Sequence, residues 1–358
     1  MRWFRFSLIF LLSIACLAVP AFAQSGRTKP SPTPTPRSIA GPSVINHPAP
    51  SKTVSPSASP TPKPTDSPDD VIKVESALVP IPVSILDDRG RAVGALKLPD
   101  FELKVDGKPV EISDMTRSET PIRLAMLFDN SSSVMLAREF EKDAAIRFFR
   151  RVIRPDRDMA ALFSVADYTR LEQALTKDVS QLTRSIETFP APQGATALFD
   201  GIIEVADYLK STNGRRVVVI VSDGEDTYSD LKTSLEDVIK ALQMADAQVY
   251  VVNTKEFENF KRTGERAGNA NTRALAAERR MIELAEQTGG AVFSPIDEKE
   301  MKDAFDRISA ELSQQYLLSY YPDDEGAKRG EFRNISVGIK SQPNVTLRTR
   351  KGYYVPKK

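Results

Sequence analysis

Five oxygen-bearing side chains are the clearest chemical signal in this sequence of 358 residues. Two are carboxylates and three are hydroxyls: Asp129, Ser131, Ser133, Thr196 and Asp223. Magnesium prefers hard oxygen ligands in near-octahedral geometry, at about 2.0–2.1 Å, with few carboxylates and some positions left to water or a partner. The five residues therefore predict a divalent cation site, provided that the fold brings them together.

The positions of these residues relative to apolar runs indicate where the site would form. The apolar run 124–128 leads directly into Asp129, and the apolar run 217–221 is followed closely by Asp223. Thr196 lies in a loop that precedes a helical pattern. In open α/β sheets, ligands bind outside the carboxyl ends of the strands. We therefore expect both carboxylates at one edge of a single sheet.

Residues 120–313 alternate between strand and helix patterns. Strands are predicted over 123–128, 159–165, 217–221, 249–252 and 291–293, and helices over 134–153, 179–189, 198–209, 235–245, 272–288 and 298–312. Continuous apolar strands separated by helices predict an α/β fold with a doubly wound, mostly parallel, Rossmann-like sheet. The polar stretch 255–280 is predicted to be a solvated insertion, with contact to a partner as the alternative.

Alternating apolar residues mark two β-rich flanks around this part of the chain. The expected divisions are 70–118 for the first flank, 119–313 for the α/β domain and 314–358 for the second flank. The first flank alone is too small for a stable domain. We therefore predict that the two flanks pair into one small accessory β-sandwich, with two separate β-ribbons as the alternative.

Three short motifs occur in a fixed order along the α/β part. They are D-x-S-x-S at 129–133, G-x-T-x-L at 194–198 and V-S-D-G at 221–224. Together they resemble the von Willebrand factor type A domain family, over residues 120–313. The flanks resemble, more loosely, a bacterial subgroup of related proteins. A capping aspartate beside a serine-rich turn, with an unrelated threonine, is the alternative interpretation.

The resemblance implies a function for the five oxygen-bearing residues. In that family these positions build a metal-ion-dependent adhesion site, which holds Mg²⁺, with Mn²⁺ and Ca²⁺ as alternatives here. An Asp or Glu carboxylate of a partner protein then completes the metal shell. This chain departs from the commonest form at two positions that are not ligands, Asn130 and Ser132. Both departures bear on the affinity of the site for its ligand more than on whether the site exists.

The first 23 residues have the features of a signal peptide. Arg2 and Arg5 precede the apolar stretch 6–19, and a small-x-small site ends at Ala23. We expect cleavage after Ala23. An uncleaved anchor and a lipid attached to Cys16 are the alternatives.

Composition limits the remaining chemistry. The 49 basic and 48 acidic residues nearly cancel, so no net field favours nucleic acid or an anionic membrane. Residues 24–69 hold 12 of the 25 prolines and are predicted to form a disordered linker. The only histidine, His47, lies in this linker, and the only cysteine, Cys16, lies in the signal peptide. Catalysis or metal binding by histidine or cysteine in the mature folded part is therefore excluded.

These observations predict an exported bacterial adhesion or interaction protein, located in the periplasm, on the cell surface or in the medium. The expected partner is a protein with an accessible carboxylate, without nucleic acid and without a stable membrane span after signal cleavage. No catalytic residue or organic cofactor is assigned, since phosphate-loop, G-x-S-x-G and H-E-x-x-H motifs are absent. A magnesium-dependent hydrolase and a structural envelope protein whose metal only stabilises a loop are the alternatives.

Overall fold

The computed structural model describes residues 78–117, 120–266, 271–322, 328–340 and 344–355. The predicted signal peptide and the predicted linker lie outside these residues. Among the described residues, no helix is long and apolar enough to cross a membrane.

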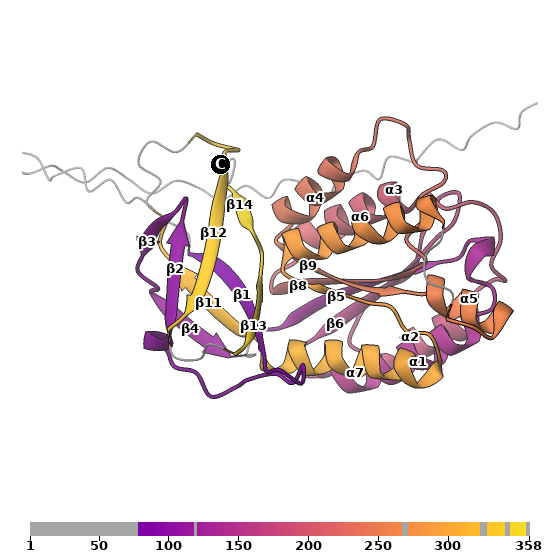
Figure 1. The fold of residues 1–358 in the computed structure, drawn as a ribbon, viewed down its shortest axis with the longest axis horizontal. Coiled ribbons are helices and arrows are strands. Elements are labelled where there is room, and N and C mark those ends of the chain that lie inside the picture. Colours follow the sequence, from indigo (N-terminus) through magenta and orange to yellow (C-terminus); the bar gives the residue numbers. More distant parts are fainter. Residues whose placement is uncertain (1–77, 118–119, 267–270, 323–327, 341–343, 356–358) are drawn as a thin grey trace, which may run out of the picture. The chain divides into compact units, whose positions relative to one another are not determined.

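A six-stranded sheet forms the centre of the α/β part (Figure 1). Its strands, in spatial order, are β10 (Ala291–Phe293), β9 (Ala247–Asn253), β8 (Arg215–Ser222), β5 (Ile122–Asp129), β6 (Met159–Val165) and β7 (Thr169–Thr176). All neighbours pair in parallel except β6 and β7, which pair antiparallel. The predicted fold class is confirmed. The edge strand β7 was not predicted, because its residues are mostly polar and only partly buried.

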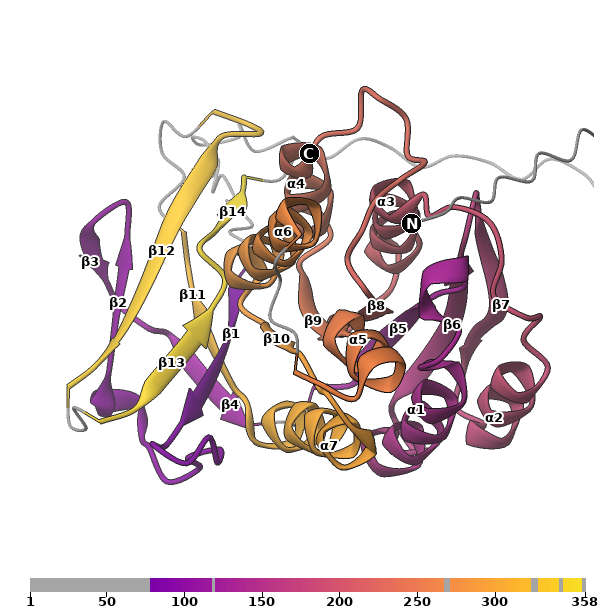
Figure 2. The same cartoon turned by 45° about the vertical axis from the view of Figure 1, so that its right-hand side comes forward.

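Helices cover both faces of this sheet because side chains alternate between the two faces along each strand. The helices on one face are α1 (Arg138–Val152), α2 (Val179–Glu187) and α7 (Glu298–Gln314), and those on the other are α3 (Leu198–Lys210), α4 (Leu235–Met244) and α6 (Thr272–Thr288). Figure 2 shows these two layers, and Figure 1 shows the short helix α5 (Lys255–Thr263) beyond one end of the strands. The stretch predicted as a solvated insertion therefore begins with a helix, whose Phe257 is fully buried in the core.

The flanking segments form two four-stranded sheets. One has the order β13 (Thr346–Thr349), β1 (Val79–Leu86), β11 (Tyr316–Tyr320), β4 (Asp114–Arg117), and the other β14 (Gly352–Tyr354), β12 (Phe332–Ile339), β2 (Phe101–Val105), β3 (Lys108–Val110). Strand β1 pairs antiparallel with both β11 and β13, so the two flanks interleave. A common apolar core that includes Ile81, Leu103 and Tyr316 joins the two sheets. The alternative of two separate ribbons is therefore wrong.

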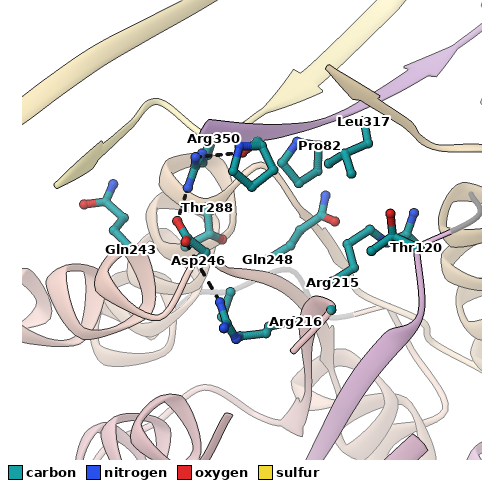
Figure 3. Close-up of a pocket in the computed structure, with 13 residues that line it drawn as sticks. Pro82, Thr120, Arg215, Arg216, Gln243, Asp246, Gln248, Thr288, Leu317 and Arg350 are labelled. Atoms are coloured by element: carbon teal, nitrogen blue, oxygen red, sulfur yellow. Dashed lines mark hydrogen bonds and ion pairs between the residues drawn. The ribbon is translucent and has the colours of Figure 1, made fainter. Parts of the chain in front are cut away.

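Polar contacts connect the sandwich to the α/β part at the amino ends of the parallel strands. Helix α7 continues through Gln315 into β11, and the Gln315 Nε2 donates to Ser84 Oγ and Gln248 Oε1, each at 2.9 Å. Arg350 forms an ion pair with Asp246. A cavity of about 200 Å³ lies at this junction (Figure 3). The cavity lies at the amino ends of the parallel strands, whereas Asp129 and Asp223 lie at their carboxyl ends.

Gly290, between α6 and β10, makes a close backbone approach that no other residue allows. A Cβ atom there would lie 1.7 Å from the carbonyl oxygen of Val249 in β9. We expect Gly290→Ala to lower the free energy of unfolding by about 3 kcal/mol, the upper range for overpacking. Gly338→Ala in β12, where the nearest atom is 3.8 Å from the new Cβ, is the matched control. Equal shifts of both variants in urea unfolding would contradict this account.

Candidate metal centre

The two predicted carboxylates lie at the carboxyl ends of neighbouring strands. Asp129 is the last residue of β5, and Asp223 directly follows the last residue of β8. Strands β5 and β8 pair in parallel, with Phe128 opposite Val221. The strand order therefore brings together two residues that are far apart in the sequence. Both carboxylates are buried, with Asp129 fully so.

Asp129 is held in place by hydrogen bonds to both of its oxygens. Its Oδ1 accepts from the backbone N–H of Ser131 at 2.9 Å, and its Oδ2 accepts from Ser222 Oγ at 2.7 Å. Burial, followed by the negative charge of Asp223, raises the pKa of Asp129 to about 6. The protein thus holds two carboxylates close together at an electrostatic cost, which a bound cation would relieve.

The hydroxyls of Ser131 and Ser133 lie side by side. The chain leaves β5 into a short 3-10 helix, Ser132–Val134, and the two Oγ atoms are 3.0 Å apart. Adjacent ligands of an octahedral magnesium ion, at about 2.0–2.1 Å from the metal, lie about 2.9 Å from each other. The serine pair, with two nearby carboxylates, therefore fits a small hard cation by both spacing and donor chemistry.

Thr196 is placed through its backbone between two other loops. Its N–H donates to Thr227 Oγ1 at 2.9 Å, and its carbonyl accepts from the N–H groups of Thr227 and Tyr228. Two residues earlier, the carbonyl of Gly194 accepts from the N–H of Ser132 at 3.3 Å. The threonine loop is therefore tied both to the serine turn and to the loop that follows Asp223, and Thr196 is buried there.

Comparison with known families identifies the family to which the α/β part belongs. The family described as the von Willebrand factor type A domain matches residues 124–307, just over half of the chain. The chain belongs to this family. A search of the curated proteins found no match.

Solved structures with similarity to this chain share little sequence with it. The PilB minor pilin from Streptococcus sanguinis has 12% identity and a TM-score of 0.42, over 58% of this chain and 64% of the pilin. The conserved hypothetical protein BatB from Bacteroides thetaiotaomicron has 16% identity and a TM-score of 0.40, over 52% of this chain and 97% of BatB. The pilus adhesin SpaC from Lactobacillus rhamnosus GG, in an open conformation, has 8% identity and a TM-score of 0.43, over 72% of this chain and 48% of SpaC.

Two acidic residues in the loop after Asp223 of this type A domain contact neighbouring segments. Glu225 pairs with Lys255 at 2.8 Å and with Arg273 at 3.3 Å. Asp226 accepts from the N–H of Leu198 at 2.9 Å and so caps the start of α3, a helix that precedes it in the sequence.

Asp200 lies in the first turn of α3. Its carboxylate accepts from Thr233 Oγ1 at 2.8 Å and from the N–H of Asp230 at 2.9 Å. It therefore fixes the same loop that contains Asp226. Both acidic side chains support the rim of the type A domain by hydrogen bonds to neighbouring segments.

Two residues near the candidate ligands were not found from the sequence. Ser222 donates to Asp129, and Lys255 Nζ lies 3.4 Å from Asp223 Oδ2. The V-S-D-G motif contains Ser222, so its position beside Asp223 was a usable signal. Nothing local marks Lys255, because its proximity to Asp223 depends on how β9 and α5 follow β8 in space.

Beneath the serine turn, α1 is anchored by a buried arginine. Arg138 Nη2 donates to the carbonyl of Asp129 and, at 2.9 Å, to Asn130 Oδ1. Its Nη1 lies 3.4 Å from Glu141 Oε2. The unusual Asn130 of the motif therefore has a structural role, since it helps to hold the guanidinium against the end of β5.

Among the described residues, no group of three or more His, Cys, Asp and Glu side chains is placed to hold a metal. A site at this rim would therefore depend on hydroxyl ligands in addition to its two carboxylates. A polar pocket of about 290 Å³ adjoins the rim, and its lining includes Asn130, Asp167, Tyr168 and Arg170. The pocket lies beside the serine turn, since Asn130 and Gly194 also belong to its lining.

Proposed function

We propose that this protein is an exported, non-catalytic interaction module that binds a partner protein through a divalent cation. Asp129, Ser131, Ser133, Thr196 and Asp223 would hold Mg²⁺, with Mn²⁺ or Ca²⁺ as alternatives. The observation that carries the proposal is the buried pair of neighbouring carboxylates beside two serine hydroxyls 3.0 Å apart. Membership of the type A family supports the same assignment.

The proposed ligands and Ser222 would have different roles in binding the ion and the partner. A bound cation would supply the positive charge to which a carboxylate oxygen of the partner coordinates. Asp129 and Asp223 would provide most of the binding energy for the ion, and Ser222 orients Asp129 by its hydrogen bond. Because three of the proposed ligands are neutral hydroxyls, the two carboxylates only balance the charge of a divalent ion, which would keep affinity for one further anionic oxygen from an acidic side chain of the partner.

The surface around the candidate ligands supports a protein partner. Large apolar side chains are exposed in the loops after β5, β6 and β8: Met135, Leu136, Tyr168, Tyr228 and Leu231. Clusters of exposed apolar residues on one face mark interaction sites. We propose a partner that presents an Asp or Glu flanked by apolar side chains, so that the carboxylate reaches the ion while its neighbours cover this rim.

The rest of the chain would deliver the module outside the cell. We propose residues 1–23 as a signal peptide and residues 24–69 as a linker that holds the folded part at a distance. Residues 70–118 and 314–358 would form the accessory sandwich, and residues 119–313 the type A domain. The periplasm, the cell surface and the medium are the compartments that fit an exported protein of this composition.

Calorimetric titration of magnesium and manganese into the protein without its first 23 residues tests the metal site. We expect one binding site in the wild type and a loss of affinity of at least tenfold in Ser131→Ala and Ser133→Ala, since each loses a direct ligand (roughly 1.4 kcal/mol or more). Ser180→Ala is the matched control, because Ser180 is an exposed serine of α2 and is not a proposed ligand. No binding by the wild type, or equal losses in all three variants, would overturn the proposal.

A further inference from the structure

Lys255 places a positive charge directly beside one of the candidate metal ligands. It is the first residue of α5, which lies beyond the carboxyl ends of the parallel strands (Figure 1). Its Nζ is 3.4 Å from Asp223 Oδ2 and 2.8 Å from Glu225 Oε1. The lysine side chain is 22% exposed, whereas that of Asp223 is 1% exposed, so water screens their interaction only in part.

The backbone around Lys255 fixes this placement. The N–H of Thr254 donates to the carbonyl of Ser222 at 3.0 Å, which ties the start of α5 to the end of β8. The N–H of Lys255 donates to Asn253 Oδ1, also at 3.0 Å. The ammonium group therefore reaches Asp223 from an ordered helix start and not from a long surface loop.

Glu225 offers the ammonium group a second position. Its carboxylate accepts Lys255 on one oxygen and lies 3.3 Å from Arg273 Nε on the other. Lys255 thus bridges a proposed metal ligand and a carboxylate that is not a proposed ligand. A small movement toward Glu225 would release Asp223 without leaving the lysine unpaired.

We propose that Lys255 is a built-in competitor of the metal ion, which occupies the negative field of Asp223 in the metal-free protein and lowers metal affinity. This inference rests on the proposed metal site. The lysine offsets part of the repulsion between Asp223 and Asp129, and a divalent ion that enters must displace the ammonium toward Glu225. Metal affinity is then set by this exchange as well as by the five ligands.

Removal of the lysine charge tests the inference. We expect Lys255→Met to bind Mn²⁺ roughly tenfold more tightly than the wild type in calorimetric titration, since Asp223 is buried and water screens its interaction with the ammonium only in part. Lys255→Arg keeps the charge and should bind as the wild type does. Lys261→Met is the matched control on the same helix, because the Lys261 ammonium lies 4.2 Å from the centre of the Phe140 ring and 3.5 Å from Glu298.

Thermal unfolding in EDTA provides a second measurement. Lys255→Met should unfold at a lower temperature than the wild type without metal, because Asp223 and Asp129 then repel each other unrelieved, and should gain more from added Mn²⁺. If Lys255→Met does not fold without metal, Lys255→Gln replaces it in both measurements.

The outcomes separate this inference from the proposed function. If the wild type binds metal and Lys255→Met binds it with equal or lower affinity, the lysine is a structural ion pair and the inference is overturned alone. If neither protein binds metal, the proposed metal site is overturned, and the inference with it.

Discussion

Asp129→Asn is expected to make the protein more stable in EDTA and insensitive to magnesium. Asp129 is fully buried, and burial together with Asp223 raises its pKa from 3.8 to about 6. At neutral pH the folded metal-free protein therefore carries a charge that it disfavours, at a cost of roughly 3 kcal/mol. Asparagine removes that charge and keeps a carbonyl oxygen for the N–H of Ser131, so we expect a gain of roughly 1–3 kcal/mol.

Added magnesium should make the wild type more stable than Asp129→Asn, which is the reverse of the order expected in EDTA. The wild type gains stability in proportion to the logarithm of metal concentration over its dissociation constant. Asp129→Asn lacks one of two charged ligands and should show no such gain. Thermal unfolding of both proteins at pH 7.5, with EDTA and with saturating magnesium, measures this reversal of stability.

The matched control for this stability comparison is Asp156→Asn, at an exposed aspartate paired with Arg157. It should follow the wild type under both conditions. Equal stabilisation of Asp129→Asn and the wild type by magnesium would show that the ion binds elsewhere. Lower stability of Asp129→Asn in EDTA would show that the hydrogen bonds to Asp129 outweigh its burial.

The second large effect is expected at Glu141, which is fully buried in α1. Burial raises its pKa from 4.5 to about 8, although the nearby Arg138 favours its charged form, and Asp129 and Glu258 add to the rise. The folded protein therefore binds one more proton than the unfolded chain between these values. This contribution to stability is complete below pH 4.5 and is lost as pH rises to 8 and above, at up to about 1.4 kcal/mol per pH unit.

Glu141→Gln removes this titration and should flatten the pH dependence. In EDTA, we expect the variant to match the wild type near pH 4.5 and to exceed it increasingly toward pH 9. Urea unfolding at a series of pH values measures the difference between the two proteins, which cancels the other titrating groups. The control is Glu139→Gln, whose side chain is 78% exposed. Parallel curves for the wild type and Glu141→Gln would show that Glu141 is ionised in the folded protein across this range.

Much of the α/β part could be predicted from the sequence because its signals are local. The strands β5 and β8 are continuous apolar runs, as a strand buried on both faces must be. Helices α3 and α6 begin within a residue of their predicted starts, since apolar periodicity defined them. Strand β7 gave no such signal, because it lies at the sheet edge with both faces partly solvated. Helix α5 was missed because it is short and polar apart from Phe257 and Phe260.

The candidate site likewise has one part that local sequence specifies and another that depends on the tertiary structure. The turn from Asp129 to Ser131 closes on itself by a hydrogen bond over two residues, so the motif alone specifies it. The metal assignment itself stays a prediction. The interleaving of the flanks, the meeting of Asp129 with Asp223, and the contact of Lys255 with Asp223 come from strand order and helix placement. All three join residues distant in the chain. The two contacts of Asp223 form because parallel neighbouring strands bring their carboxyl ends to the same end of the sheet. The sequence by itself therefore determined most elements of the α/β part and the local turns, whereas only the tertiary structure decided which charges face one another.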